Sequence, residues 1–162
     1  HLASLGGARK VGICWRSSNT SGMRAHACTD IVQWRDVFAV EGIEFVNLQY
    51  DRCEAELAKA RSLFGARIHT APGVDLFDDL LETSALMSAP DLVVSAPTVV
   101  GLHAAGLGVP TWQLTCGLDW QCLGTAHNPW LPSLTRIYRQ YDRGWDEVLA
   151  EVAAKLRDGG RK

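Results

Sequence analysis

The stretch DLVVSAPTVVGLHAAGLGVPTW, residues 91–112, indicates how this chain folds. It opens with residues 91–94, a short apolar and β-branched run typical of a strand buried on both faces. Pro97 suits the first turn of a helix, and the small residues that follow allow the helix to lie close to a sheet. Gly108 ends that helix, and residues 109–114 form the next apolar run. The stretch therefore predicts a strand, helix and strand joined as a right-handed parallel crossover.

A crossover of this kind leaves free backbone N–H groups and the positive end of a helix dipole at the carboxyl edge of the sheet. Phosphate and carboxylate groups bind at such edges in open α/β folds. A purely structural crossover remains the alternative, because most helix starts of this type bind nothing. The chain contains neither GxGxxG nor GxxxxGK[ST], which argues against an ordinary dinucleotide or P-loop site.

The rest of the chain alternates between strand-like and helix-like patterns. This alternation predicts an α/β fold, a Rossmann-like open parallel sheet with helices on both faces. We expect five or six strands, with those after Lys10 and Asp91 near the middle, in a single domain over residues 1–162. The further strands are expected at 11–15, 43–49, 66–70 and 134–138, and the further helices at 30–40, 52–64, 76–89 and 145–156.

Composition narrows the class of protein. The chain has 162 residues, 47% of them hydrophobic and 21% charged, with a net charge of −2. That length suits one well-cored domain, the charge provides no basic face for nucleic acid, and no apolar run is long enough for a membrane span. The five cysteines have no CxxC or ligand spacing, so we expect reduced thiols in a cytoplasmic protein. Because the chain starts at His1 with no initiator Met or signal peptide, we expect it to be a piece of something larger.

Arg16 lies where the first expected strand ends. In a parallel sheet, the carboxyl end of that strand faces the same side as the turn at residues 95–98. Arg16 is therefore a candidate cation for a phosphate bound there, with a solvated loop arginine as the alternative. Thr98 would offer a hydroxyl, and Gly101 would leave room for the ligand.

Several separated motifs carry a family resemblance: VGICWRSS, FVNLQYD, GVDLFDDLLETSALMSAPDLVVSAPT, GLGVPTWQL, DW and NPWLPS. Together they resemble the carboxyl-terminal half of a GT-B glycosyltransferase over about residues 10–156. They are most similar to the heptosyltransferase-like domains of glycosyltransferase family nine that follow tetratricopeptide repeats in bacterial proteins and are akin to O-linked N-acetylglucosamine transferases. The resemblance implies binding of a nucleotide-diphospho-sugar donor. It also implies a missing amino-terminal half that supplies most of the acceptor site, so that this piece alone turns over no donor.

The resemblance also implies roles for particular positions, although it assigns no catalytic residue. The phosphates of the donor are expected at the helix start and at the loop after the first strand. The base and ribose are expected beyond the second and third strands. His103 and Trp120 are further candidates. The implied phosphate ligands are Arg16, Ser17, Ser95, Thr98, Val99 and Gly101, and the implied base and ribose contacts are Gln49, Gly73 and Asp75.

The chain departs from the family at two positions. The family commonly has an Asp before the Thr and a His four residues after it, where this chain has Pro97 and Leu102. His103 is one place late, about 100° around the helix. Catalytic competence is thereby in question, which leaves a non-catalytic pseudo-glycosyltransferase scaffold beside repeats as the first alternative. A nucleotide-sugar epimerase is the second.

Other site chemistry has little support in the sequence. His26, His69 and His127 lack ligand spacing, so neither a metal nor a cofactor is expected, and the nucleotide sugar is a substrate. The acidic residues at 78, 79 and 82 fit a helix start better than a paired-carboxylate site. Ser17 and Ser95 lack the glycine-flanked elbow of a hydrolase.

Overall fold

A computed structural model describes residues 7–117, 120–125 and 127–159, apart from the side chains of Met23 and Trp120. Its centre is a six-stranded sheet in the order β3-β2-β1-β4-β5-β6, in which every neighbouring pair is parallel. The predicted α/β class, strand direction and central position of β1 and β4 are confirmed. The strands are β1 (Arg9–Cys14), β2 (Ile43–Asn47), β3 (Ile68–His69), β4 (Leu92–Ser95), β5 (Thr111–Cys116) and β6 (Leu134–Arg139).

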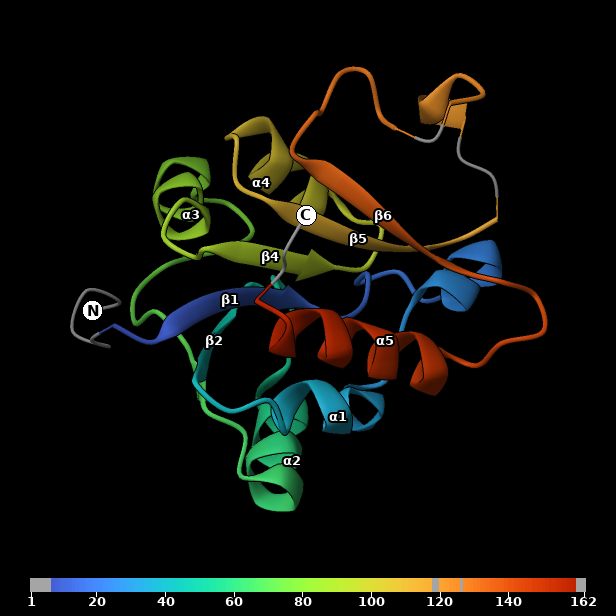
Figure 1. Ribbon diagram of the computed structural model, residues 1–162. Coiled ribbons are helices and arrows are strands. Elements are labelled where there is room, and N and C mark those ends of the chain that lie inside the picture. The colour runs from blue at the N-terminus through green and yellow to red at the C-terminus, as the bar shows by residue number, and fades with distance from the viewer. Residues whose placement is uncertain (1–6, 118–119, 126, 160–162) are drawn as a thin grey trace.

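Helices cover both faces of this sheet, as Figure 1 shows. One face is covered by the 3-10 helix η3 (Ile31–Trp34) with α1 (Arg35–Phe38), α2 (Glu54–Phe64) and α5 (Trp145–Arg157). The other is covered by α3 (Leu80–Met87) and α4 (Val99–Gly106). Two further 3-10 helices, η2 (Gly22–Ala27) and η4 (Trp120–Cys122), lie in the loops after β1 and β5.

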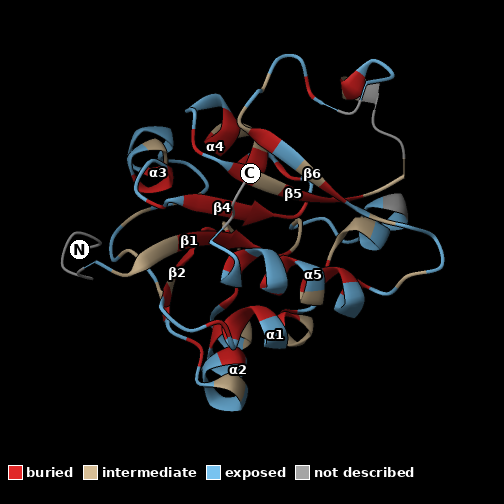
Figure 2. Cartoon of the chain, viewed as in Figure 1, coloured by how far each residue is buried: buried red, intermediate tan, exposed pale blue. Residues whose placement is uncertain are grey.

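The alternation of side chains along the central strands divides the core into two layers. Ile13 and Val94 face the η3, α1, α2 and α5 layer, whereas Cys14 and Val93 face α3 and α4. Figure 2 shows the central strands buried from both sides. The continuous apolar run of β4 is therefore explained by a strand that is covered on both faces.

Two predicted helices are shorter than expected. Asp30 is the N-cap of the first, as predicted, and only the second begins late. In the first, Asp30 accepts from Val32 N, and Gln33 bonds back to Asp30 N, which gives the 3-10 helix η3 before the single turn of α1. In the second, Asp75 accepts from two successive N–H groups and forms a turn, so α3 begins only after Asp79, which caps it.

The helix α4 lies against the sheet through a glycine. A Cβ atom at Gly101 would stand 3.2 Å from Ser95 Cβ and 3.3 Å from Ser95 Oγ. Gly101 thus allows the close approach of α4 to β4, and it does not leave room for a ligand as the sequence had suggested. Gly108 has φ +82°, which fits its predicted role in ending α4.

Among the described residues, no helix is long and apolar enough to cross a membrane.

Candidate functional site at the carboxyl edge of the sheet

The strand order reverses direction between β1 and β4, because the chain runs outward from β1 to β3 and then returns to the other side of β1. In open parallel sheets, ligands bind in the crevice outside the carboxyl ends of the strands at such a switch point. One cavity, which we call the first cavity, lies at this crevice. It has a volume of about 380 Å³. Its lining comes from the ends of β1, β2 and β4, from η2 and from the start of α4: Ser17, Arg24, Ala27, Cys28, Tyr50, Ala96, Pro97, Thr98, Val99 and Leu102.

The start of α4 forms one wall of the first cavity. Thr98 is the N-cap residue, but its hydroxyl makes no capping bond; Thr98 Oγ1 lies 3.3 Å from Ser95 Oγ and 3.6 Å from Cys14 Sγ instead. The first N–H groups of an α-helix have no partner within the helix, so α4 brings backbone donors and a positive dipole end to this wall. Val99 lines the same wall and is exposed.

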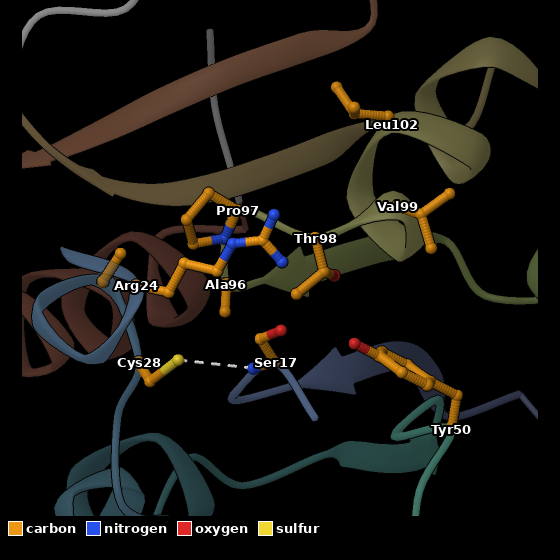
Figure 3. Close-up of a pocket in the computed structure, with 10 residues that line it drawn as sticks. Ser17, Arg24, Cys28, Tyr50, Ala96, Pro97, Thr98, Val99 and Leu102 are labelled. Carbon is orange, nitrogen blue, oxygen red and sulfur yellow. Dashed lines mark hydrogen bonds between the residues drawn. The ribbon is translucent and has the colours of Figure 1, made fainter. Parts of the chain in front are cut away.

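Arg24 supplies the cation of the first cavity. Among the described residues that line it, Arg24 alone is charged, and none is acidic. In Figure 3 the guanidinium group reaches toward the side formed by Pro97 and Thr98. Within the described part of the chain, Arg24 has no ion-pair partner. Arg24 was not among the residues predicted from the sequence, because η2 lies in a polar loop without periodicity. The one available signal was a basic residue between the first strand and the Asp30 cap.

Two tertiary contacts hold the segment that carries Arg24. At its end, Thr29 N and Thr29 Oγ1 both donate to the carbonyl oxygen of Trp15, at 3.0 and 2.8 Å. Within it, the carbonyl oxygen of His26 accepts from Trp145 Nε1 at 3.1 Å and from Arg139 Nη2 at 3.4 Å. Arg139 also lies over the Trp145 ring, 5.1 Å from its centroid. The carboxyl-terminal elements β6 and α5 therefore position a wall of a cavity formed mostly by the first hundred residues.

Arg16 lies elsewhere, among carboxylates. Its guanidinium group makes ion pairs with Asp51 and with Glu56, the latter at 2.5 Å, and Glu56 also accepts from Trp15 Nε1 at 2.8 Å. These bonds raise the pKa of Arg16 further above its usual value, with Glu56 the largest cause. We refer to Arg16, Asp51 and Glu56 as the Arg16 cluster. This placement does not fit the predicted phosphate contact, because two carboxylates already offset the charge and Arg16 does not line the first cavity.

A second cavity of about 750 Å³ lies beyond β2 and β3, with Gln49, Asp75 and Phe77 among its lining residues. The Gln49 amide bridges the strand ends, since Nε2 donates to Arg16 O at 3.0 Å and to Asp51 Oδ1 at 2.8 Å. The pKa of Asp75 is lowered by the N–H groups of Phe77 and residue 78. Gly73, with φ +79°, is a turn residue and does not line either cavity. Tyr50 lines both cavities.

The remaining candidates fall in different places. His103 Nε2 lies 2.9 Å from Ser84 Oγ, where α4 packs on α3, and it does not line the first cavity. Ser17 lines that cavity, while Ser95 is buried beneath it and donates to Ala96 O. The side chain of Trp120 is outside the described part of the structure. The two positions where the family carries Asp and His, Pro97 and Leu102, do line the first cavity.

The described residues contain no group of three or more His, Cys, Asp or Glu side chains that could hold a metal ion. Burial raises the pKa of the Cys14 thiol, which lies under Thr98, to about 12. The binding chemistry of the first cavity is therefore that of one guanidinium group, backbone N–H donors and hydroxyls, a combination that suits phosphate oxygens.

Three solved chains show the same fold over nearly the whole of this chain. The chain superimposes on E. coli heptosyltransferase WaaC with ADP at a TM-score of 0.63 and 14% identity, covering 96% of this chain and 44% of that one. WaaC with ADP-2-deoxy-2-fluoro heptose gives a TM-score of 0.58 and 13% identity, and the match covers 95% of this chain and 43% of that one. A protein described as a UDP-N-acetylglucosamine 2-epimerase, from Listeria monocytogenes, superimposes at a TM-score of 0.61 and 21% identity. The match covers 98% of this chain and 39% of that one. The chain has the fold of one half of a GT-B glycosyltransferase.

In sequence, the chain is similar to Protein FlbA of Caulobacter vibrioides, with 36% identity over 157 residues. The match covers 97% of this chain and 26% of FlbA, so the chain spans about a quarter of the length of that relative. No protein-family model matches.

Proposed function

We propose that this domain binds the nucleotide diphosphate of a sugar donor, as half of a glycosyltransferase that transfers the sugar to an acceptor. The observation that carries the proposal is the composition of the first cavity at the switch point. It joins the start of α4 to the guanidinium group of Arg24, which has no ion-pair partner among the described residues, and contains no carboxylate among its described lining residues. Such an arrangement favours an anion with several oxygens, and it would stabilise charge on a leaving diphosphate.

Isothermal titration of the 162-residue chain with ADP, UDP and GDP tests the proposal directly. We expect at least one of them to bind, and we expect it to slow alkylation of Cys28, which lines the first cavity, at saturating concentration. Cys116 is similarly half-buried and lies outside the cavity, so its alkylation rate is the internal control. If none of the three nucleotides binds, the donor-site proposal fails. Binding that leaves the Cys28 rate unchanged would place the nucleotide elsewhere.

The rest of the enzyme is part of the same proposal. The matched solved chains are more than twice as long, since this chain covers 39–44% of each. We therefore propose that a second half, with tetratricopeptide repeats as in the O-linked N-acetylglucosamine transferases, completes the acceptor site. The five free thiols support a reducing compartment such as the cytoplasm. Robust transfer of the sugar to a purified acceptor by this chain alone would contradict the two-half arrangement, whereas weak hydrolysis of the donor would not.

A non-catalytic scaffold is the second candidate, and a specific observation favours it. Pro97 and Leu102 both line the first cavity. At the two positions where the family has polar groups, this chain therefore places apolar side chains in the cavity. The longer protein decides between the two: diphosphate binding with no transfer would support the scaffold. The epimerase alternative is supported by fold likeness alone.

A further inference from the structure

A third cavity lies beside the first one and shares a residue with it. Its volume is about 250 Å³, and it is lined by Leu102, Gln121, Asn128, Trp130 and Leu131. Leu102, one turn into α4, lines both cavities. A ligand that binds its phosphates at the start of α4 would therefore have its next chemical group close to this space. The third cavity is too small for a nucleoside diphosphate but has room for one monosaccharide ring.

Trp130 gives the third cavity an aromatic wall. Its side chain is 60% exposed, although a tryptophan of a folded domain usually buries most of its surface. Leu102 and Leu131 provide the other apolar surfaces. A broad, accessible indole face in a small cavity matches the apolar C–H face of a pyranose ring better than it matches a phosphate or a flexible chain.

Asn128 adds a polar group that is directed to the same place. It is 4% exposed, and its Oδ1 accepts from Trp130 N at 3.0 Å, which fixes the orientation of the amide. Within the described part of the chain, its amide nitrogen donates to no partner. The nitrogen is not among the buried polar atoms that lack a partner, so it is accessible and can donate to a ligand hydroxyl at this cavity. An aromatic face with a nearby amide donor is the combination that a sugar ring can use.

We infer that the third cavity is a sugar subsite, in which the donor sugar stacks on Trp130 and accepts a hydrogen bond from the Asn128 amide. The inference rests on the proposed function for its orientation, since the phosphates must lie in the first cavity for the sugar to reach the third. It goes beyond that function by naming the residues that contact the transferred group. Leu102 would then separate the phosphate and sugar portions of the site.

Paired titrations test the sugar contact. The probes are ADP with ADP-glucose, UDP with UDP-N-acetylglucosamine, and GDP with GDP-mannose, titrated into wild type, Trp130→Ala and Asn128→Asp. The Asn128→Asp variant keeps the oxygen that accepts from Trp130 N and removes the donor. We expect Trp130→Ala to bind the sugar nucleotide roughly tenfold more weakly, as for the loss of about 50 Å² of apolar contact. Asn128→Asp should also weaken it roughly tenfold, because it removes one donated hydrogen bond. Both variants should bind the matching diphosphate within about twofold of wild type. Tyr141→Ala removes an aromatic residue that is 97% exposed and lines none of the three cavities, so it is the matched control.

Each outcome has a defined meaning. If Trp130→Ala leaves the sugar nucleotide unaffected, or weakens it no more than the diphosphate, the sugar subsite is overturned while the donor-site proposal stands. If wild type binds no diphosphate, the donor-site proposal fails, and methyl glycosides then test the cavity directly. In that case, a shift of the Trp130 indole NMR signal that is reduced in Asn128→Asp would support a sugar site. The lack of any shift would overturn it.

Discussion

Two arginines follow the first strand of this protein, and their surroundings differ. Arg16 comes directly after β1 and is held by Asp51 and Glu56, whereas Arg24 lies in η2 and faces a cavity without acidic lining residues. The Arg16 cluster therefore uses its cation to join the end of β1 to the β2–α2 connection and to α2, whereas Arg24 has no ion-pair partner among the described residues and is available to the proposed ligand. The position of an arginine at a strand end therefore does not by itself show whether its charge is paired within the protein.

The largest effect is expected from the cation of the first cavity. Arg24→Ala should weaken binding of a nucleoside diphosphate by about tenfold to a hundredfold, because a hydrogen bond to a charged group contributes about 1.5–3 kcal/mol. Thermal unfolding should be unchanged, since Arg24 has no ion pair among the described residues. Titration calorimetry measures the change, and Arg35→Ala, an exposed arginine on α1, is the control. Unchanged affinity in Arg24→Ala would remove the distinction between the two arginines.

The opposite pattern is expected for Arg16→Ala. It leaves two partly exposed carboxylates without their cation, so the free energy of unfolding should fall by about 1–2 kcal/mol after allowance for solvent screening. Diphosphate affinity should change by less than about threefold. Urea unfolding measures stability, and a double-mutant cycle with Glu56→Gln isolates the pair. A loss of affinity as large as that of Arg24→Ala, at unchanged stability, would return the phosphate role to Arg16.

Cys14 connects the two regions and should make stability depend on pH. Its Sγ lies 3.6 Å from Arg16 O and 3.6 Å from Thr98 Oγ1, and burial raises its pKa from 9.0 to about 12. The folded state therefore favours the neutral thiol, so its contribution is complete below pH 9 and is lost as the pH rises toward 12. At pH 10 the loss from Cys14 should be about 1 kcal/mol relative to pH 7. Urea unfolding at both pH values should show a smaller difference in Cys14→Ala than in wild type. The remaining difference comes in part from Cys53, whose pKa burial raises to about 11.

The smallest effect is expected from the contact that positions η2. Trp145→Phe keeps an aromatic ring beneath Arg139 and removes the bond from Trp145 Nε1 to His26 O. Because a neutral hydrogen bond contributes about 0.5–1.5 kcal/mol, diphosphate affinity should fall by about threefold through a less ordered Arg24. In the Arg24→Ala background, the same substitution should have no further effect on affinity. An equal loss in both backgrounds would show that Trp145 does not act through Arg24.

The sequence predicted the sheet well because each central strand has a local signature. The run at residues 91–94 is apolar on both faces, and the cap at Asp30 and the stop at Gly108 are local features too. The same local reasoning placed Ser17, Thr98 and Val99 at the cavity. It was less accurate for Gly101, which faces the sheet, and for His103, which faces α3. Which way a residue of α4 points depends on how the helix packs on the sheet.

The sequence by itself determined the parallel α/β architecture, the central place of the strands after Lys10 and Asp91, and the helix start near residue 98, since these follow from hydrophobic periodicity and from the backbone preferences of Pro and Gly. The tertiary structure alone decided which arginine has its charge neutralised. Asp51 and Glu56 lie 35 and 40 residues from Arg16, and Trp145 lies 119 residues from His26. Electrostatic pairing acts through space, so only the folded chain shows that Arg16 is ion-paired within the protein and that Arg24 lines a cavity.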